Sequence, residues 1–179
     1  MEQVYLLTGR PGTGKTSLIK QVVAAMGAKA GGFYTEEIRT GGVRKGFRLI
    51  TLDGAEAILA HINIRSPHRV SRYGVDVDSL ERVGVSALNR AARECPLVII
   101  DEIGKMELFS ASFKEAVLSL ISSDKPVLAT IMSSPHPWAD AIKQRPGVRL
   151  VEVTRAKYQR VLEELSSWLE ASLKSNWRS

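Results

Sequence analysis

The sequence lacks the features that mark secreted and membrane-spanning proteins. Its one cysteine, Cys95, excludes a disulfide within the chain and fits a reducing compartment. No apolar run approaches the roughly 20 residues that span a bilayer. The first residues enter an apolar strand with no basic leader and no small-residue cleavage site. We therefore expect a cytoplasmic protein that does not bind membranes.

Internal repeats, low-complexity tracts and linkers are also missing from the 179 residues. Hydrophobic residues make up 44% of the chain and charged residues 25%, which is ordinary for a globular protein. The length suits one domain with a substantial core. We expect a single domain over residues 1–179 that works as a monomer.

Short apolar strands alternate with amphipathic helices along most of the chain. This alternation predicts an α/β fold with a mainly parallel sheet and helices on both faces. The expected strands cover residues 4–7, 97–100, 127–131 and 148–153, and the expected helices cover residues 15–26, 78–94, 113–121, 139–143 and 158–173.

Local signals set several further boundaries. Residues 33–38 and 43–52, joined at a Thr-Gly-Gly turn, predict an antiparallel hairpin at the edge of the sheet. Gly27 follows the first helix and is expected to end it. Asp78 and Glu81 have the spacing of a capping box, which predicts the start of the helix that reaches about residue 94.

A glycine-rich segment between the first strand and the first helix matches the phosphate-binding P-loop pattern G-x-x-x-x-G-K-[ST]. Its residues are Gly9, Arg10, Pro11, Gly12, Thr13, Gly14, Lys15 and Thr16. The glycines let backbone N–H groups turn toward a phosphate, where a Cβ would obstruct them. We expect Lys15 to lie against the β- and γ-phosphates as a catalytic group and the Thr16 hydroxyl to bind Mg²⁺. The positive end of the following helix adds to this anion site.

A second motif ends an apolar strand with two acids. Asp101 and Glu102 directly follow the apolar residues 97–100, so they lie at the carboxyl end of a strand, beside the P-loop in this fold class. Asp101 can hold the hydration shell of Mg²⁺ there, and Glu102 can orient or deprotonate an attacking water. Together the two motifs predict Mg²⁺-dependent hydrolysis of a nucleoside triphosphate.

Four segments are more distinctive than either motif alone: residues 9–16, 32–39, 46–47 and 101–110. Together they resemble the small nucleoside-triphosphatases of the THEP-one type, also known as cancer-related nucleoside-triphosphatase, and the similarity covers nearly the whole chain. The resemblance implies a RecA-like P-loop fold. It also implies slow, Mg²⁺-dependent hydrolysis of several nucleoside triphosphates, ATP and GTP among them, without sharp base preference.

The resemblance also assigns roles to the residues that follow the strand. It extends the nucleotide site from the P-loop to Asp101, Glu102, Ile103 and Gly104, with Asp101 as the metal-shell acid and Glu102 as the base or water-orienting group.

The roles of four other residues stay open. Lys105 and Glu107 could form a structural ion pair with each other or take part in catalysis. After the fourth strand the family usually has an Asn-Arg pair, where this chain has Lys157-Tyr158. If that pair contacts the nucleotide in the family, this chain makes the contact differently.

Two other functions fit the same motifs. A nucleotide or small-molecule kinase also uses a P-loop, and the segment with Arg65, Arg69 and Arg72 could close over two substrates as a lid. A nucleotide-switched RNA-binding module would use slow hydrolysis to reset itself. Glu102 favours water as the acceptor and therefore the hydrolase. No Asn-Lys-x-Asp guanine-reading sequence occurs, which disfavours a GTPase switch.

The charge balance bears on the RNA-binding alternative. The formal net charge is +6 and the pI is near 9.6, which permits a nucleic-acid partner. The basic residues are spread along the chain, however, and no aromatic-basic RNA-binding pattern accompanies them. A nucleoside triphosphate carries about four negative charges, so a basic active-site face suits it equally well. A nucleic-acid partner is permitted but not favoured.

Overall fold

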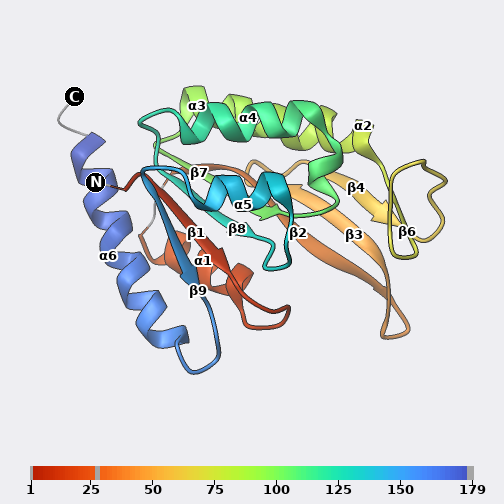
Figure 1. Ribbon diagram of the computed structural model, residues 1–179, viewed down its shortest axis with the longest axis horizontal. Coiled ribbons are helices and arrows are strands. Elements are labelled where there is room, and N and C mark those ends of the chain that lie inside the picture. The colour runs from red at the N-terminus through yellow and green to blue at the C-terminus, as the bar shows by residue number, and fades with distance from the viewer. Residues whose placement is uncertain (1, 27–28, 177–179) are drawn as a thin grey trace.

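The computed structural model describes residues 2–26 and 29–176 (Figure 1). A mixed sheet of nine strands runs through these residues in the order β5-β6-β4-β3-β2-β7-β8-β1-β9. Helices cover both of its faces (Figure 1). The predicted α/β class with helices on both faces of the sheet is confirmed for the described part of the chain, but the sheet is mixed and not mainly parallel.

One half of the sheet is parallel. Its strands are β2 (Ala30–Thr40), β7 (Leu97–Ile103), β8 (Val127–Ile131), β1 (Val4–Thr8) and β9 (Val148–Glu152). Neighbours in this half pair in parallel from β2 through to β9. The central strands β7, β8 and β1 are mostly apolar and buried on both faces, as strands between two helical layers require. β1, β7, β8 and β9 occupy the positions predicted from the apolar runs, whereas the parallel pairing of β2 with β7 was not predicted.

The other half of the sheet is antiparallel and larger than the predicted hairpin. β2 turns into β3 (Val43–Thr51) as expected, but β3 is not an edge strand. The sheet continues through β4 (Glu56–His61), β6 (Tyr73–Val75) and β5 (Arg69–Val70). The hairpin therefore joins a parallel half to an antiparallel extension, and β2 belongs to both.

The helices divide between the two faces of the sheet. One face carries α3 (Ser86–Glu94), α4 (Ala111–Ile121) and α5 (Pro137–Lys143), and the other carries α1 (Lys15–Met26) and α6 (Tyr158–Asn176) (Figure 1). Successive strand residues alternate between the two layers. In β7, Val98 and Ile100 pack with the first group, whereas Leu97 and Ile99 pack with the second. Two hydrophobic layers thus hold the sheet from both sides.

The predicted capping box is wrong by two residues. The helical segment α2 (Val77–Ser79) begins after Asp76, whose carboxylate accepts a hydrogen bond from the Ser79 N–H at 3.0 Å. Asp78 is exposed, and Glu81 instead accepts a hydrogen bond from the Ser110 hydroxyl at 2.7 Å. A π-helical stretch, η1 (Leu80–Val85), connects α2 to α3. Asp76 was missed because its partner Ser79 does not fit the Ser/Thr-x-x-Glu pattern.

The parallel strands bring three loops and an acidic pair to one edge of the sheet. The carboxyl ends of β1, β8 and β9 lead into the P-loop, residues 132–134 and the segment after Glu152, and Asp101 and Glu102 lie near the carboxyl end of β7. Functional groups in open α/β sheets gather at this edge. Gly27, which was expected to end α1, lies outside the described residues. Within residues 2–26 and 29–176, no helix is both long and apolar enough to cross a membrane.

Candidate active site

The P-loop connects β1 to α1 through glycines in conformations that other residues rarely adopt. Gly9 has a φ of 143° and Gly14 a φ of 89°. A Cβ on Gly9 would also lie 2.6 Å from the Val153 carbonyl oxygen, too close for any side chain. The Leu18 N–H donates to the Gly14 carbonyl at 2.9 Å, which starts the helical hydrogen bonds of α1. The N–H groups of the first turn therefore have no partner within the helix and can bind an anion.

Lys15 lies inside the curve of the P-loop. Its ammonium donates to the carbonyl oxygens of Gly9 and Arg10, both at 2.9 Å. Burial lowers the pKa of Lys15, while the nearby carboxylates of Glu102 and Asp101 act in the opposite direction. The charge is thus held at the centre of the loop, close to both predicted acids.

Asp101 is fixed by two hydroxyl groups. Thr16, from α1, donates to its Oδ2 at 2.7 Å, and Thr130, from β8, donates to its Oδ1 at 2.7 Å. The residue is only 3% exposed. Burial raises the pKa of Asp101, and the two hydroxyl donors oppose that rise. The Thr16–Asp101 contact brings together the two residues that the sequence proposed as metal ligands, whereas Thr130 was not predicted.

Glu102 is half-buried next to Asp101 and lies against the backbone of the following turn. A Cβ on Gly104 would lie 2.5 Å from Glu102 Oε1, so a side chain at this position would displace the carboxylate. Burial raises the pKa of Glu102, the charge of Asp101 adds to the rise, and Lys15 opposes it. The peptide bond between Asp101 and Glu102 is cis. Glu102 therefore combines a raised pKa with a place beside the P-loop lysine.

These groups line one cavity of about 540 Å³. The predicted residues that line it are Gly9, Pro11, Gly12, Gly14, Lys15, Thr16, Asp101 and Glu102. The other four predicted residues do not line it. The Thr13 hydroxyl donates to the Arg10 carbonyl at 3.0 Å, Ile103 is buried in the core, and Gly104 donates its N–H to Glu107 at 3.2 Å.

Part of the cavity wall was missed in the sequence. Residues 132–134 after β8 line it, as do Thr35, Glu36 and Glu37 of β2 and Arg44 and Phe47 of β3. Residues 32–39 and 46–47 carry part of the family resemblance, but nothing in them predicts a place at the site, because the two strands reach the P-loop only through strand pairing. Thr130 gave a weak signal as the one polar residue in an otherwise apolar strand.

The arginine in the cavity wall is Arg44, not one from the proposed lid. Arg44 donates to the Tyr73 hydroxyl at 3.0 Å and to Glu37 at 3.1 Å. These contacts lower the pKa of Glu37, chiefly through the hydrogen bond from Arg44. In the segment predicted as a lid, Arg69 and Arg72 donate to nearby backbone carbonyls at 2.8 and 2.7 Å. Both arginines therefore support the antiparallel strands.

Glu107 is not paired with Lys105, so that alternative is wrong for the described residues. Glu107 is 3% exposed and accepts the Gly104 N–H, whereas Lys105 is exposed. Burial raises the pKa of Glu107 well above its ordinary value, and the charge of Glu102 raises it further. Two buried carboxyl groups thus flank one turn.

Tyr158, one of the two residues that depart from the family pattern, contacts the P-loop. A Cβ on Gly14 would lie 3.0 Å from the Tyr158 ring. The Tyr158 hydroxyl donates to the Gln21 side chain of α1 at 3.2 Å. The ring therefore packs the start of α6 against the start of α1.

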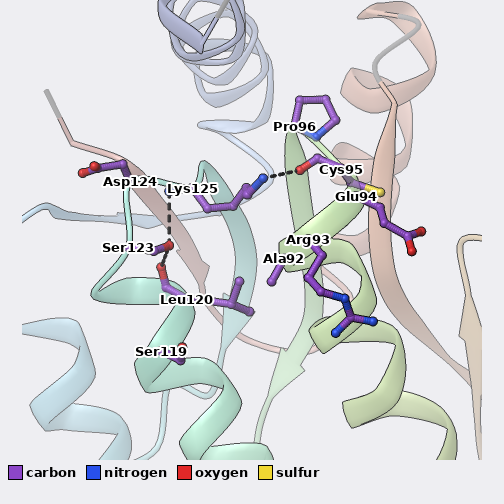
Figure 2. A pocket seen from close by; sticks show the side chains of 10 residues that line it. All are labelled: Ala92, Arg93, Glu94, Cys95, Pro96, Ser119, Leu120, Ser123, Asp124 and Lys125. Atoms are coloured by element: carbon purple, nitrogen blue, oxygen red, sulfur yellow. Dashed lines mark hydrogen bonds between the residues drawn. The ribbon is translucent and has the colours of Figure 1, made fainter. Parts of the chain in front are cut away.

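A second large cavity lies at the amino ends of the parallel strands, opposite the end of the sheet that carries the P-loop (Figure 2). It measures about 570 Å³ and lies between the segments that precede β7 and β8. Figure 2 shows the Lys125 ammonium directed at the Cys95 carbonyl, to which it donates at 2.7 Å. Because this cation already has a partner and the P-loop is at the other edge, we place the chemistry in the 540 Å³ cavity.

The oxygen atoms around Thr16 fit a magnesium ion. Mg²⁺ binds oxygen ligands and usually keeps several waters, with one or two carboxylates and the substrate phosphates completing its shell. The Thr16 hydroxyl and the Asp101 carboxylate supply that chemistry. No group of three or more His, Cys, Asp or Glu residues gathers as a metal site among residues 2–26 and 29–176. The donor set therefore suits a metal that arrives with its nucleotide.

Comparison with known proteins agrees with this geometry. A family described as NTPase matches residues 4–166. A nucleoside-triphosphatase THEP1 from Thermotoga petrophila is 48% identical over 160 residues, which cover 89% of each chain. One from Methanocaldococcus jannaschii is 40% identical over 94% of this chain and 98% of the relative.

Two solved structures share the fold. The crystal structure of THEP1 from Aquifex aeolicus has a TM-score of 0.85 and 40% identity, over 93% of this chain and 98% of that one. The solution structure of a human cancer-related nucleoside triphosphatase has a TM-score of 0.80 and 34% identity, over 95% and 98%. With the P-loop, Asp101 and Glu102 assembled in one cavity, the chain belongs to this family of P-loop nucleoside-triphosphatases.

Proposed function

We propose that the chain hydrolyses nucleoside triphosphates, ATP and GTP among them, to the diphosphate and phosphate, with Mg²⁺ as cofactor. The observation that carries the proposal is the Thr16–Asp101 hydrogen bond, with Lys15 and Glu102 in the same cavity. A phosphate-binding loop, a metal-binding pair and a carboxylate free to act on water are the parts that hydrolysis requires.

Each side chain has a separate part in the proposed reaction. The P-loop N–H groups and Lys15 bind the β- and γ-phosphates, where charge develops in the transition state. Thr16 and Asp101 would hold Mg²⁺, which neutralises charge on the phosphate oxygens. Thr130 keeps the Asp101 carboxylate in place through the second hydroxyl hydrogen bond. Glu102 orients a water and accepts its proton as the water attacks the γ-phosphorus.

Broad base selectivity is part of the proposal. The predicted residues lining the cavity bind phosphate and metal, and the sequence has no Asn-Lys-x-Asp segment to recognise guanine. A site that holds the triphosphate firmly and the base loosely discriminates little between bases.

A phosphate-release assay with ATP, GTP, CTP and UTP tests this function. We expect the kcat/KM values to lie within about tenfold of one another, which is roughly 1.4 kcal/mol of discrimination. EDTA should abolish release, and added Mg²⁺ should restore it. A preference above about a thousandfold for one base would contradict loose base recognition, and full activity in EDTA would contradict the metal.

A further inference from the structure

A smaller cavity adjoins the phosphate cavity at Glu102. It measures about 290 Å³. The two cavities share lining residues from both halves of the sheet, including Thr35, Glu102 and Ser134. The Glu102 side chain therefore lies at the boundary between the triphosphate site and this second space, which we call the side chamber.

The side chamber has an apolar floor built by the antiparallel extension. Leu59 of β4, Val70 of β5 and Met106 line the side chamber but not the phosphate cavity. Phe47 of β3 completes the floor, and its ring centroid lies 5.3 Å from that of Tyr73 in an edge-to-face contact. Leu59 is 2% exposed. Most of this apolar surface comes from the paired strands β3, β4 and β5, and not from a single loop.

Hydrolysis alone gives no reason for such a space. Liquid water occupies about 30 Å³ per molecule, so the chamber has room for on the order of ten non-hydrogen atoms. A single attacking water needs far less, and an apolar floor holds water poorly. Size and apolarity together fit the body of a small organic molecule.

The polar groups of the side chamber restrict that molecule further. Glu102 and Glu107 both line the side chamber, and the negative charge of either carboxyl group, when ionised, disfavours an anion. Lys105, the one cation among the lining residues, is exposed at its ammonium-bearing side chain. The hydroxyls of Thr35 and Ser134 can hydrogen-bond a neutral polar group. An uncharged alcohol with an apolar body matches this lining.

We infer that the side chamber is a phosphoryl-acceptor site for a small uncharged alcohol, which competes with water for the γ-phosphoryl group. The inference rests on the proposed function, because the same P-loop, metal pair and Glu102 serve both acceptors. The alcohol oxygen forms a bond to the γ-phosphorus as the bond to the β,γ-bridging oxygen breaks. The electron pair of that bond leaves with the diphosphate, and the alcohol proton passes to Glu102 and then to solvent. The products are a phosphate monoester, the diphosphate and one proton.

Benzyl alcohol and methanol are suitable probes, since both are neutral and only benzyl alcohol has an apolar body. The full-length protein is incubated with ATP, Mg²⁺ and one alcohol, and phosphorus NMR measures phosphate monoester against inorganic phosphate. We expect the ester-to-phosphate ratio, at equal alcohol concentration, to be at least about tenfold higher for benzyl alcohol than for methanol. Burial of the apolar ring in the side chamber accounts for the difference, because removing apolar surface from water is favourable.

Two valine variants locate the effect. Val70→Phe fills the side chamber from a short edge strand, and Val43→Phe adds the same bulk to an exposed hairpin position. Val70→Phe should lower the ester-to-phosphate ratio with benzyl alcohol about tenfold, toward the ratio with methanol. Its rate of phosphate release without alcohol should stay within about twofold of the wild-type rate. Val43→Phe should change neither value. Thermal melts of both variants verify that they fold.

The outcomes separate this inference from the hydrolase proposal. Phosphate release without ester from either alcohol would overturn the side chamber as an acceptor site and leave hydrolysis standing. The same ester-to-phosphate ratio with benzyl alcohol in Val70→Phe and in the wild type would also overturn the acceptor-site inference. Absence of both phosphate and ester would overturn the two proposals together.

Discussion

The two halves of the sheet contribute different chemistry to the same cleft. The parallel half supplies the P-loop, Asp101, Thr130 and Glu102, all at the carboxyl ends of buried strands. The antiparallel half supplies a wall with Arg44 and Phe47 and the apolar floor of the side chamber. The groups proposed to bind phosphate and metal come from the carboxyl ends of the parallel strands, whereas the space around them comes from the antiparallel extension of the same sheet. Substitutions in the two halves should therefore have different effects.

The largest effect is expected in the parallel half, at the P-loop lysine. Lys15→Ala removes the charge that we propose meets the β- and γ-phosphates, so steady-state hydrolysis should fall by about 10²–10³-fold or more. Nucleotide binding, followed by calorimetry, should weaken as well. Lys174→Ala, on the exposed side of α6, is the matched control and should hydrolyse at the wild-type rate. A steady-state hydrolysis rate of Lys15→Ala within twofold of the wild-type rate would contradict the assignment of this segment as a P-loop.

The second effect should appear in the metal dependence. Asp101→Asn keeps the shape of the side chain but removes the charge that we propose attracts Mg²⁺. We expect the Mg²⁺ concentration for half-maximal activity to rise by about 10–100-fold, with a lower rate at saturation. Asp78→Asn changes an exposed acid outside the site and serves as the control. An unchanged Mg²⁺ titration in Asp101→Asn would show that the metal is held elsewhere.

The smallest effect concerns stability and belongs to the side-chamber wall. Glu107 has a raised pKa in the folded protein, so its ionisation opposes folding. At pH values below the unfolded-state pKa of 4.5, neutral Glu107 makes its full contribution to the stability of the fold. That contribution is lost as the pH rises through the folded-state pKa of Glu107. Glu107→Gln can still accept the Gly104 N–H but cannot ionise. Between pH 5 and pH 9 the unfolding free energy should therefore fall less in Glu107→Gln than in the wild type.

Urea denaturation in EDTA at several pH values measures this difference. Glu115→Gln, on the exposed face of α4, is the control and should follow the wild-type pH dependence. Parallel curves for the wild type and Glu107→Gln would contradict the raised pKa of Glu107.

The parallel half was predictable from sequence because its signals are local. The P-loop is one continuous segment, and Asp101-Glu102 directly ends an apolar strand, so strand order brings them together without further information. Thr130 needed the pairing of β7 with β8, which no short pattern encodes. The antiparallel extension was mostly missed because β5 and β6 contain two and three residues and lie in a basic segment that resembled a lid. The position of Glu107 depended on burial, which the pattern Lys-Met-Glu does not reveal.

The central claim is that Glu102 acts on the water that attacks the γ-phosphorus. Single-turnover hydrolysis of radiolabelled ATP by Glu102→Gln tests this claim most directly, because it measures chemistry apart from product release. The variant keeps the size of the side chain against Gly104 and should bind ATP as the wild type does. Its hydrolysis rate should fall by about a hundredfold or more, since a positioned base typically contributes 10²–10⁴-fold. A wild-type rate in that single turnover would contradict the account and assign the water to another group.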